Sequence, residues 1–146
     1  MKRSFLISIL AMVFIQAKSQ QNLRPAYLAT VPANFKNCGV LYTYDSVSVD
    51  KNKFLLVVDM QDKGLIRLEG KQVKLLLKES KTEGAINTST YNGGGYTVVI
   101  AVTTVSSNAK FDTEKGTIKI SKGTKTLTLQ VQGRSACDPT TQEGNS

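Results

Sequence analysis

Residues 126–132 read Thr-Leu-Thr-Leu-Gln-Val-Gln, an unbroken alternation of polar and apolar side chains. Successive side chains of a β-strand point to opposite faces, so this stretch predicts a strand with one buried and one solvated face. Ile118 and Ile120 alternate with polar neighbours in the same way, and residues 96–105 form the longest β-branched run. No window after the first 20 residues carries an apolar stripe of helical period, so we predict an all-β fold.

Further strand candidates lie upstream, separated by turn residues such as Glu69-Gly70-Lys71, and they cover residues 40–44, 46–49, 54–58, 65–68, 73–77 and 85–91. About eight short strands at roughly ten-residue spacing, with one apolar face each, predict a small antiparallel β-barrel or sandwich. We assign this β domain to residues 38–137. Residues 20–37 hold two of the three prolines and are predicted to form an extended N-terminal arm, and residues 138–146 a flexible tail.

The first 19 residues have the three-part layout of a secretory signal. Lys2 and Arg3 precede an apolar run from Phe5 to Ile15, and Ala17-Lys18-Ser19 places small residues three and one positions before a cut. The apolar run of about 11 residues is shorter than the roughly 20 needed to span a bilayer. We therefore expect a secreted or periplasmic protein that begins at Gln20 and has no transmembrane segment.

Loss of the signal lowers the net charge, because three basic residues leave with it. The mature chain keeps 16 basic and 11 acidic residues, a net charge of +5. Its lysines are dispersed and its arginines are only Arg24, Arg67 and Arg134. Bidentate base contacts and stacking on bases use arginine heavily, so we expect no nucleic-acid partner.

Several kinds of active site are excluded by composition. The chain has no histidine, which removes the commonest general base and the commonest transition-metal ligand. Asp45, Asp50, Asp59 and Asp62 lack the spacing of a calcium loop, and the glycines at 93–95 are not followed by the Lys-Ser/Thr of a phosphate-binding loop. We predict a binding protein with no catalytic residue, metal or cofactor, not an enzyme.

The two cysteines, Cys38 and Cys137, are predicted to form one disulfide, because the chain is directed to an oxidising compartment. Nearly all of the strand-like sequence lies between them. The bond would join the first and last parts of the β domain.

Tyr91 and Tyr96 flank the glycine run. Two interpretations are open. The rings pair across a hairpin, or they face a ligand at the mouth of a barrel.

Three stretches resemble motifs of the small secreted bacterial inhibitors of c-type lysozyme (the MliC type). They are IRLEGKQVKL at 66–75, SKTEGA at 80–85 and KGTKTL at 122–127, and the two cysteines stand at the expected ends of the motif region. The resemblance covers roughly residues 35–137. It implies a small antiparallel barrel closed by a disulfide between its first strand and its end.

The resemblance also implies a mechanism. A loop serine or threonine (Ser80 or Thr82) and a turn lysine (Lys122) would enter the lysozyme cleft and meet its two catalytic carboxylates. We therefore expect a secreted domain that binds another protein, with lysozyme as the particular partner. The alternatives are a barrel for a small ligand or glycan, with Tyr91 and Tyr96 at its mouth, and a structural envelope component.

Overall fold

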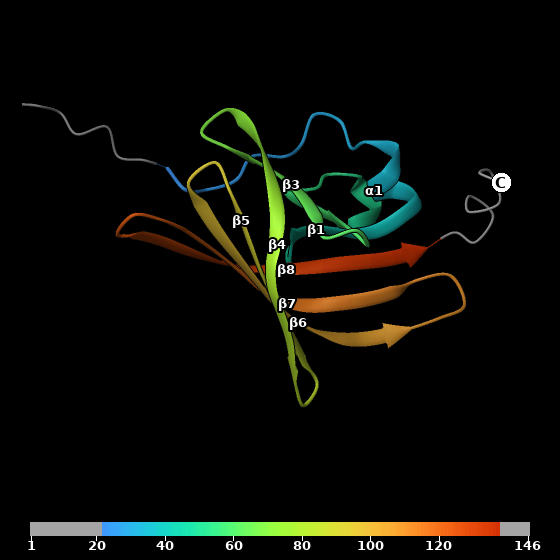
Figure 1. The fold of residues 1–146 in the computed structure, drawn as a ribbon. Helices are drawn as coiled ribbons and strands as arrows, with labels where there is room; N and C mark the ends of the chain where they lie inside the picture. Colours follow the sequence, from blue (N-terminus) through green and yellow to red (C-terminus); the bar gives the residue numbers. More distant parts are fainter. Residues whose placement is uncertain (1–21, 138–146) are drawn as a thin grey trace, which may run out of the picture.

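Each strand pairs with the next one along the chain, and the last strand pairs with the first (Figure 1). The computed structural model describes residues 22–137; the predicted signal, the first two residues of the arm and the predicted tail lie outside this range. The elements are α1 (Ala33–Asn37), β1 (Cys38–Tyr44), the 3-10 helix η1 (Val49–Lys51), β2 (Leu56–Asp59), β3 (Lys63–Leu68), β4 (Lys71–Glu83), β5 (Ile86–Gly93), β6 (Tyr96–Ser107), β7 (Asp112–Lys122) and β8 (Lys125–Cys137). All neighbours are antiparallel, which confirms the predicted all-β class and decides for a closed barrel over a sandwich.

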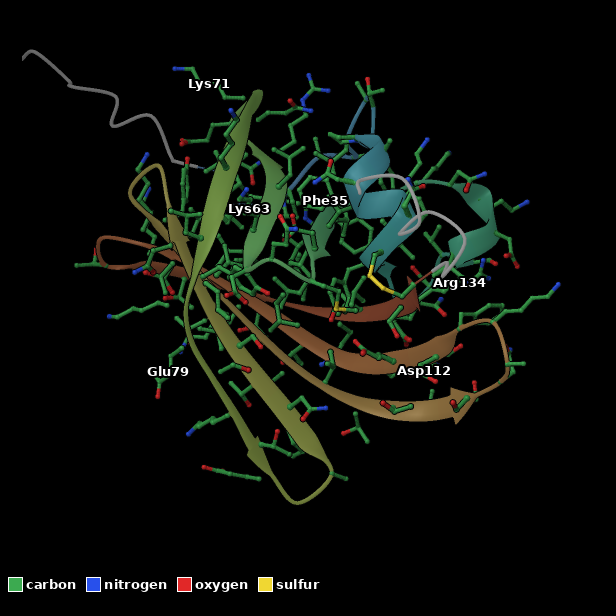
Figure 2. The ribbon with its side chains drawn as sticks, turned by 45° about the vertical axis from the view of Figure 1, so that its right-hand side comes forward. Phe35, Lys63, Lys71, Glu79, Asp112 and Arg134 are labelled. Atoms are coloured by element: carbon green, nitrogen blue, oxygen red, sulfur yellow. A yellow bond between two sulfur atoms is a disulfide. The ribbon has the colours of Figure 1, made fainter. Side chains whose placement is uncertain are left out.

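Closure depends on the pairing of β1 with β8. The register runs from Cys38 opposite Cys137 to Tyr44 opposite Val131. The predicted disulfide joins the two cysteines at the first of these pairs, and a yellow bond marks it in Figure 2. A closed barrel leaves no free sheet edge along paired strands, which removes the usual template for aggregation.

Every second side chain of a strand points inward, and these side chains fill the barrel interior. On β6 these are Val98, Ile100 and Val102, and the alternate residues between them are partly exposed. Ile66 of β3 and Ile120 of β7 are fully buried in the same cluster. An eight-stranded barrel is just wide enough for side chains to fill it, as they do here at mid-height.

A second apolar cluster lies on the outer face of β1, β2 and β3, under the N-terminal arm. Leu28 and Phe35 of the arm pack there against Phe54, Val57 and Leu65. Two buried faces explain why β2 is apolar without alternation: Leu56 and Val58 point into the barrel and Val57 points under the arm.

The sequence predicts an extended arm, but part of the arm is helical: residues 33–37 form helix α1. Pro32 stands at its N-cap, where a missing backbone N–H costs nothing, and the single turn buries Phe35. A helix of five residues is too short to show a periodic stripe in the sequence.

The strand predicted at residues 46–49 is wrong. A turn follows Asp45, and Ser48 then caps the 3-10 helix η1, since its hydroxyl accepts a hydrogen bond from the backbone N–H of Asp50. Serine side chains compete in this way with strand pairing.

The strands differ greatly in length, and this makes the two ends of the barrel unlike. At one end lie the tight turns β3–β4, β5–β6 and β7–β8; we call it the Lys122 end. At the other end β2 and β3 stop early, while β4 and β5 continue as one projecting hairpin and β6 and β7 as another; we call it the Glu114 end. Figure 1 shows these two hairpins diverging. No helix within residues 22–137 is long and apolar enough to cross a membrane.

Replacing both cysteines with serine should lower the free energy of unfolding, because the disulfide closes a loop with a sequence separation of 99. The chain-entropy estimate is about 4–5 kcal/mol, which corresponds to a fall in melting temperature of roughly 10–20 °C. Calorimetry of the oxidised protein and the double variant measures this difference. Equal melting temperatures would show that the bond does not constrain the unfolded chain.

Candidate functional site

The five residues predicted to contact a partner or ligand fall at opposite ends of the barrel. Lys122 and Tyr96 lie at the Lys122 end. Ser80, Thr82 and Tyr91 lie toward the Glu114 end, on β4 and β5. The structure therefore does not bring Lys122 together with Ser80 and Thr82. It does not pair the two tyrosines either, since Tyr91 stands opposite Val98 and Tyr96 opposite Gly93.

At the Lys122 end the lysine is held inside the protein's own network. Its ammonium donates to a carboxylate oxygen of Glu69 at 3.3 Å and lies 4.6 Å from the centre of the Tyr96 ring. The Tyr96 hydroxyl donates to the same oxygen of Glu69. This hydrogen bond and the nearby lysine lower the pKa of Glu69, and the hydrogen bonds to Tyr96 and Glu69 raise the pKa of Lys122.

The surface beside this network is a basic hollow of about 660 Å³. Lys71, Lys74 and Lys122 line it, together with Glu69 and Tyr96. All three lysines are at the surface, so water solvates them without a ligand.

At the Glu114 end the central contact is between Tyr42 and Glu114. The Tyr42 hydroxyl donates to Oε2 of Glu114 at 2.7 Å. In the register Tyr42 stands opposite Gly133, and Gly133 stands opposite Glu114. A Cβ at position 133 would lie 2.6 Å from the Tyr42 ring, so the glycine leaves the space through which that ring reaches Glu114.

A small pocket of about 170 Å³ opens beside this pair. It is bounded by residues from five strands and the β2–β3 turn, namely Val40, Tyr42, Val58, Asp59, Met60, Asn87, Ser89, Tyr91, Ile100, Val102 and Glu114. Apolar and polar groups share its wall about equally. A concave site on which polar side chains converge is a candidate ligand site.

Burial dominates the electrostatics of the pocket. It raises the pKa of Glu114, with nearby Asp112 adding to the shift and the Tyr42 hydrogen bond opposing it. Burial also raises the pKa of Tyr42 well above its usual range, with Glu114 as the next cause. Burial, Asp62 and Asp59 raise the pKa of Tyr91 to about 12. Both tyrosines therefore stay neutral at physiological pH.

Two of the sequence-predicted residues support the pocket from the projecting hairpin. Ser80 shares a hydrogen bond of 3.1 Å with Ser89, and the Thr82 hydroxyl donates to the side-chain oxygen of Asn87 at 2.8 Å. Ser89 and Asn87 both line the pocket.

Sequence reasoning missed Tyr42 and Glu114. A signal existed for Glu114, because it is separated from the inward-pointing Ile118 and Ile120 by an even number of residues. An acidic residue in phase with buried apolar residues points into the barrel. The alternation of apolar and polar residues does not show that Tyr42 is the hydrogen-bond partner of Glu114.

Within residues 22–137 no group of three acidic or cysteine side chains is placed to hold a metal ion. Comparison of the chain with protein-family models, with curated proteins and with solved structures finds no match.

The raised pKa of Glu114 makes stability depend on pH. The folded state holds this proton more tightly than the unfolded state, so the contribution to stability is complete below the ordinary value of 4.5 and is lost as pH rises through the raised pKa. Glu114→Gln keeps the shape and an oxygen acceptor for Tyr42 but cannot ionise. From pH 4 to pH 8 the variant should therefore lose less unfolding free energy than the wild type.

Urea denaturation at several pH values measures this difference. Glu83→Gln removes a carboxylate from an exposed position of the same end and should keep the wild-type pH profile. A Glu114→Gln profile parallel to that of the wild type would contradict the burial argument.

Proposed function

We propose that this protein is an exported binding domain that captures another protein through the Glu114 end. The observation that carries the proposal is the placement of exposed apolar side chains. Met60, Ile86 and Val105 are 58, 49 and 54% exposed, and all three lie at this end, on the β2–β3 turn and the two projecting hairpins. Each of the three elements that border this end therefore presents an apolar side chain that a partner protein can bury.

The projecting hairpin adds backbone groups that a partner can use. β3 begins at Lys63, opposite Leu76, so residues 78–83 of β4 pair with β5 alone within the described range. A strand edge of this kind can accept an extended segment of another chain. Lys78, Glu79, Lys81 and Glu83 are charged and exposed, which discourages unselective pairing with other copies.

The filled interior favours a protein partner over a ligand enclosed in the barrel. Fully buried Ile66, Val98 and Ile120 occupy the middle of the barrel, and the two hollows described above lie at its ends. The disulfide fits export, because such bonds persist in oxidising compartments. Together with the predicted signal at residues 1–19, it supports a secreted or periplasmic location.

Photo-crosslinking tests the proposed surface. A benzophenone amino acid in place of Ile86 should form adducts with a partner protein in the envelope or medium of the cells that make this protein. Leu76 is the matched control, since it is also apolar and 63% exposed but lies on the outer face of β4, beside Lys63 of β3 and outside the projecting hairpins. Adducts should form at least five times more efficiently from position 86.

Equal yields from positions 86 and 76 would indicate unselective contacts and contradict the proposal. The absence of any protein adduct from position 86, and likewise from positions 60 and 105, would also overturn it.

Inhibition of a c-type lysozyme is the narrower form of this proposal, and it rests on the resemblance. The structure favours the Lys122 turn as the inserted element, because residues 123–126 are exposed at the end of the β7–β8 hairpin. Ser80 and Thr82 lie toward the opposite end and would not enter the same cleft. The Lys122 ammonium would have to leave Glu69 to reach the enzyme's carboxylates.

A lysozyme activity assay with purified variants tests this form. Lys122→Ala should weaken inhibition at least about tenfold, or about 1.4 kcal/mol. Lys119→Ala removes the same charge from an exposed position of the same strand and should have little effect. Glu69→Gln should strengthen inhibition, because it releases the Lys122 ammonium. No inhibition by the wild type at micromolar concentration, or equal losses from the two lysine variants, would rule lysozyme out.

A further inference from the structure

The pocket at the Glu114 end contains polar atoms that the protein itself does not satisfy. Tyr91 is only 6% exposed, yet its hydroxyl forms no hydrogen bond with another residue in the range 22–137. Glu114 accepts the Tyr42 hydrogen bond through Oε2, which leaves Oε1 free. Both oxygens are open to the pocket, and a hydroxyl held on a buried side chain beside a free carboxylate oxygen offers acceptors to a donor.

The acidic lining of the pocket favours a donor that carries a positive charge. Its two charged lining residues, Asp59 and Glu114, are both acidic, and no lysine or arginine lines it. Asp112 and Asp62 are close enough to act on Glu114 and Tyr91. This acidic hollow stands in a chain whose net charge is positive.

The size and walls of the pocket favour a cation on an aliphatic stem. A volume of about 170 Å³ equals roughly five or six waters at about 30 Å³ each, a space that suits an alkylamine. Val58, Ile100 and Val102 offer apolar contact to such a stem, and the rings of Tyr42 and Tyr91 offer faces that attract a cation.

We propose that this pocket binds an aliphatic ammonium group, and that a lysine side chain of the partner protein supplies it. The part of this inference that assigns the lysine to a partner protein rests on the proposed function. An ammonium has three donors, which match Oε1 of Glu114, the Tyr91 hydroxyl and the side-chain oxygen of Ser89 or Asn87. A guanidinium is a planar fork with five donors, more than these acceptors satisfy.

The surroundings explain how a polypeptide could deliver the lysine. Residues 78–83 of β4 border this end with an open strand edge, and Ser80 and Thr82 hold the pocket residues Ser89 and Asn87 from that strand. Figure 2 shows the two projecting hairpins diverging, with Glu79 on one and Asp112 at the start of β7 in the other. A segment lying along β4 can turn one side chain down into the pocket.

Titration with short peptides tests the pocket without any partner protein. The probes are N-acetylated, C-amidated Ala-Lys-Ala and the same peptide with norleucine in place of lysine, which keeps the stem and removes the charge. Chemical shifts of the tyrosine ring protons and calorimetry report binding. The lysine peptide should bind with a dissociation constant of about 1 mM or below, and the norleucine peptide at least tenfold more weakly.

Two variants locate the binding. Glu114→Gln should raise the dissociation constant of the lysine peptide at least tenfold. Glu83→Gln removes the same charge from the β4–β5 hairpin and should change this constant less than twofold. Tyr91→Phe keeps the ring and removes the free hydroxyl, and should weaken binding about threefold. It supplies the test if Glu114→Gln fails to fold.

Three results would overturn the proposed ammonium site: no saturable binding of the lysine peptide up to 50 mM, equal binding of the norleucine peptide, or equal losses of affinity from Glu114→Gln and Glu83→Gln. The two proposals fail separately. Peptide binding without crosslinking from any of positions 60, 86 and 105 would keep the ammonium pocket and remove protein capture. Crosslinking without peptide binding would keep protein capture and remove the pocket.

Discussion

Seven residue pairs between β1 and β8 hold the barrel closed, and the Cys38–Cys137 disulfide lies at the first of them. Without this pairing the eight strands would be an open meander with two long edges. With it, residues from the two ends of the β domain share one interior. Tyr42 and Glu114 are 72 residues apart in sequence. They meet because β8 stands between them and has a glycine at the position where their contact crosses it.

Unequal strand length gives this closed barrel its asymmetry. β2 has four residues and β3 has six, whereas β4 and β8 have thirteen each. The short strands are covered on their outer face by the arm and α1. The long strands continue beyond the filled interior, so their inward side chains change from apolar to polar. Apolar and polar side chains meet in the pocket because of that change.

The two ends of the barrel also differ in whether their charged side chains have a counter-ion. At the Lys122 end the cation is matched by Glu69, and the surrounding lysines are solvated. At the Glu114 end the carboxylate accepts a hydrogen bond from a neutral tyrosine, forms no ion pair with another residue of the range 22–137, and lies near Asp112. A half-buried carboxylate without a counter-ion is the less stable arrangement, and binding a cation stabilises it. A cationic ligand would therefore stabilise the Glu114 end more than the Lys122 end.

The sequence by itself determined the class of the fold. Alternation at residues 126–132 and 117–120, with turn residues between short apolar runs, encodes strands with two unlike faces, and the cysteine pair encodes a bond between the ends of the domain. Period two states which face a residue occupies, so the inward phase of Glu114 was readable. It does not state which residue lies opposite on another strand, because turns and bulges such as the one between Leu77 and Glu79 set the register. The tertiary structure alone therefore placed Tyr42 beside Glu114, and it alone separated Lys122 from Ser80 and Thr82, since antiparallel strands send their turns alternately to opposite ends of the barrel.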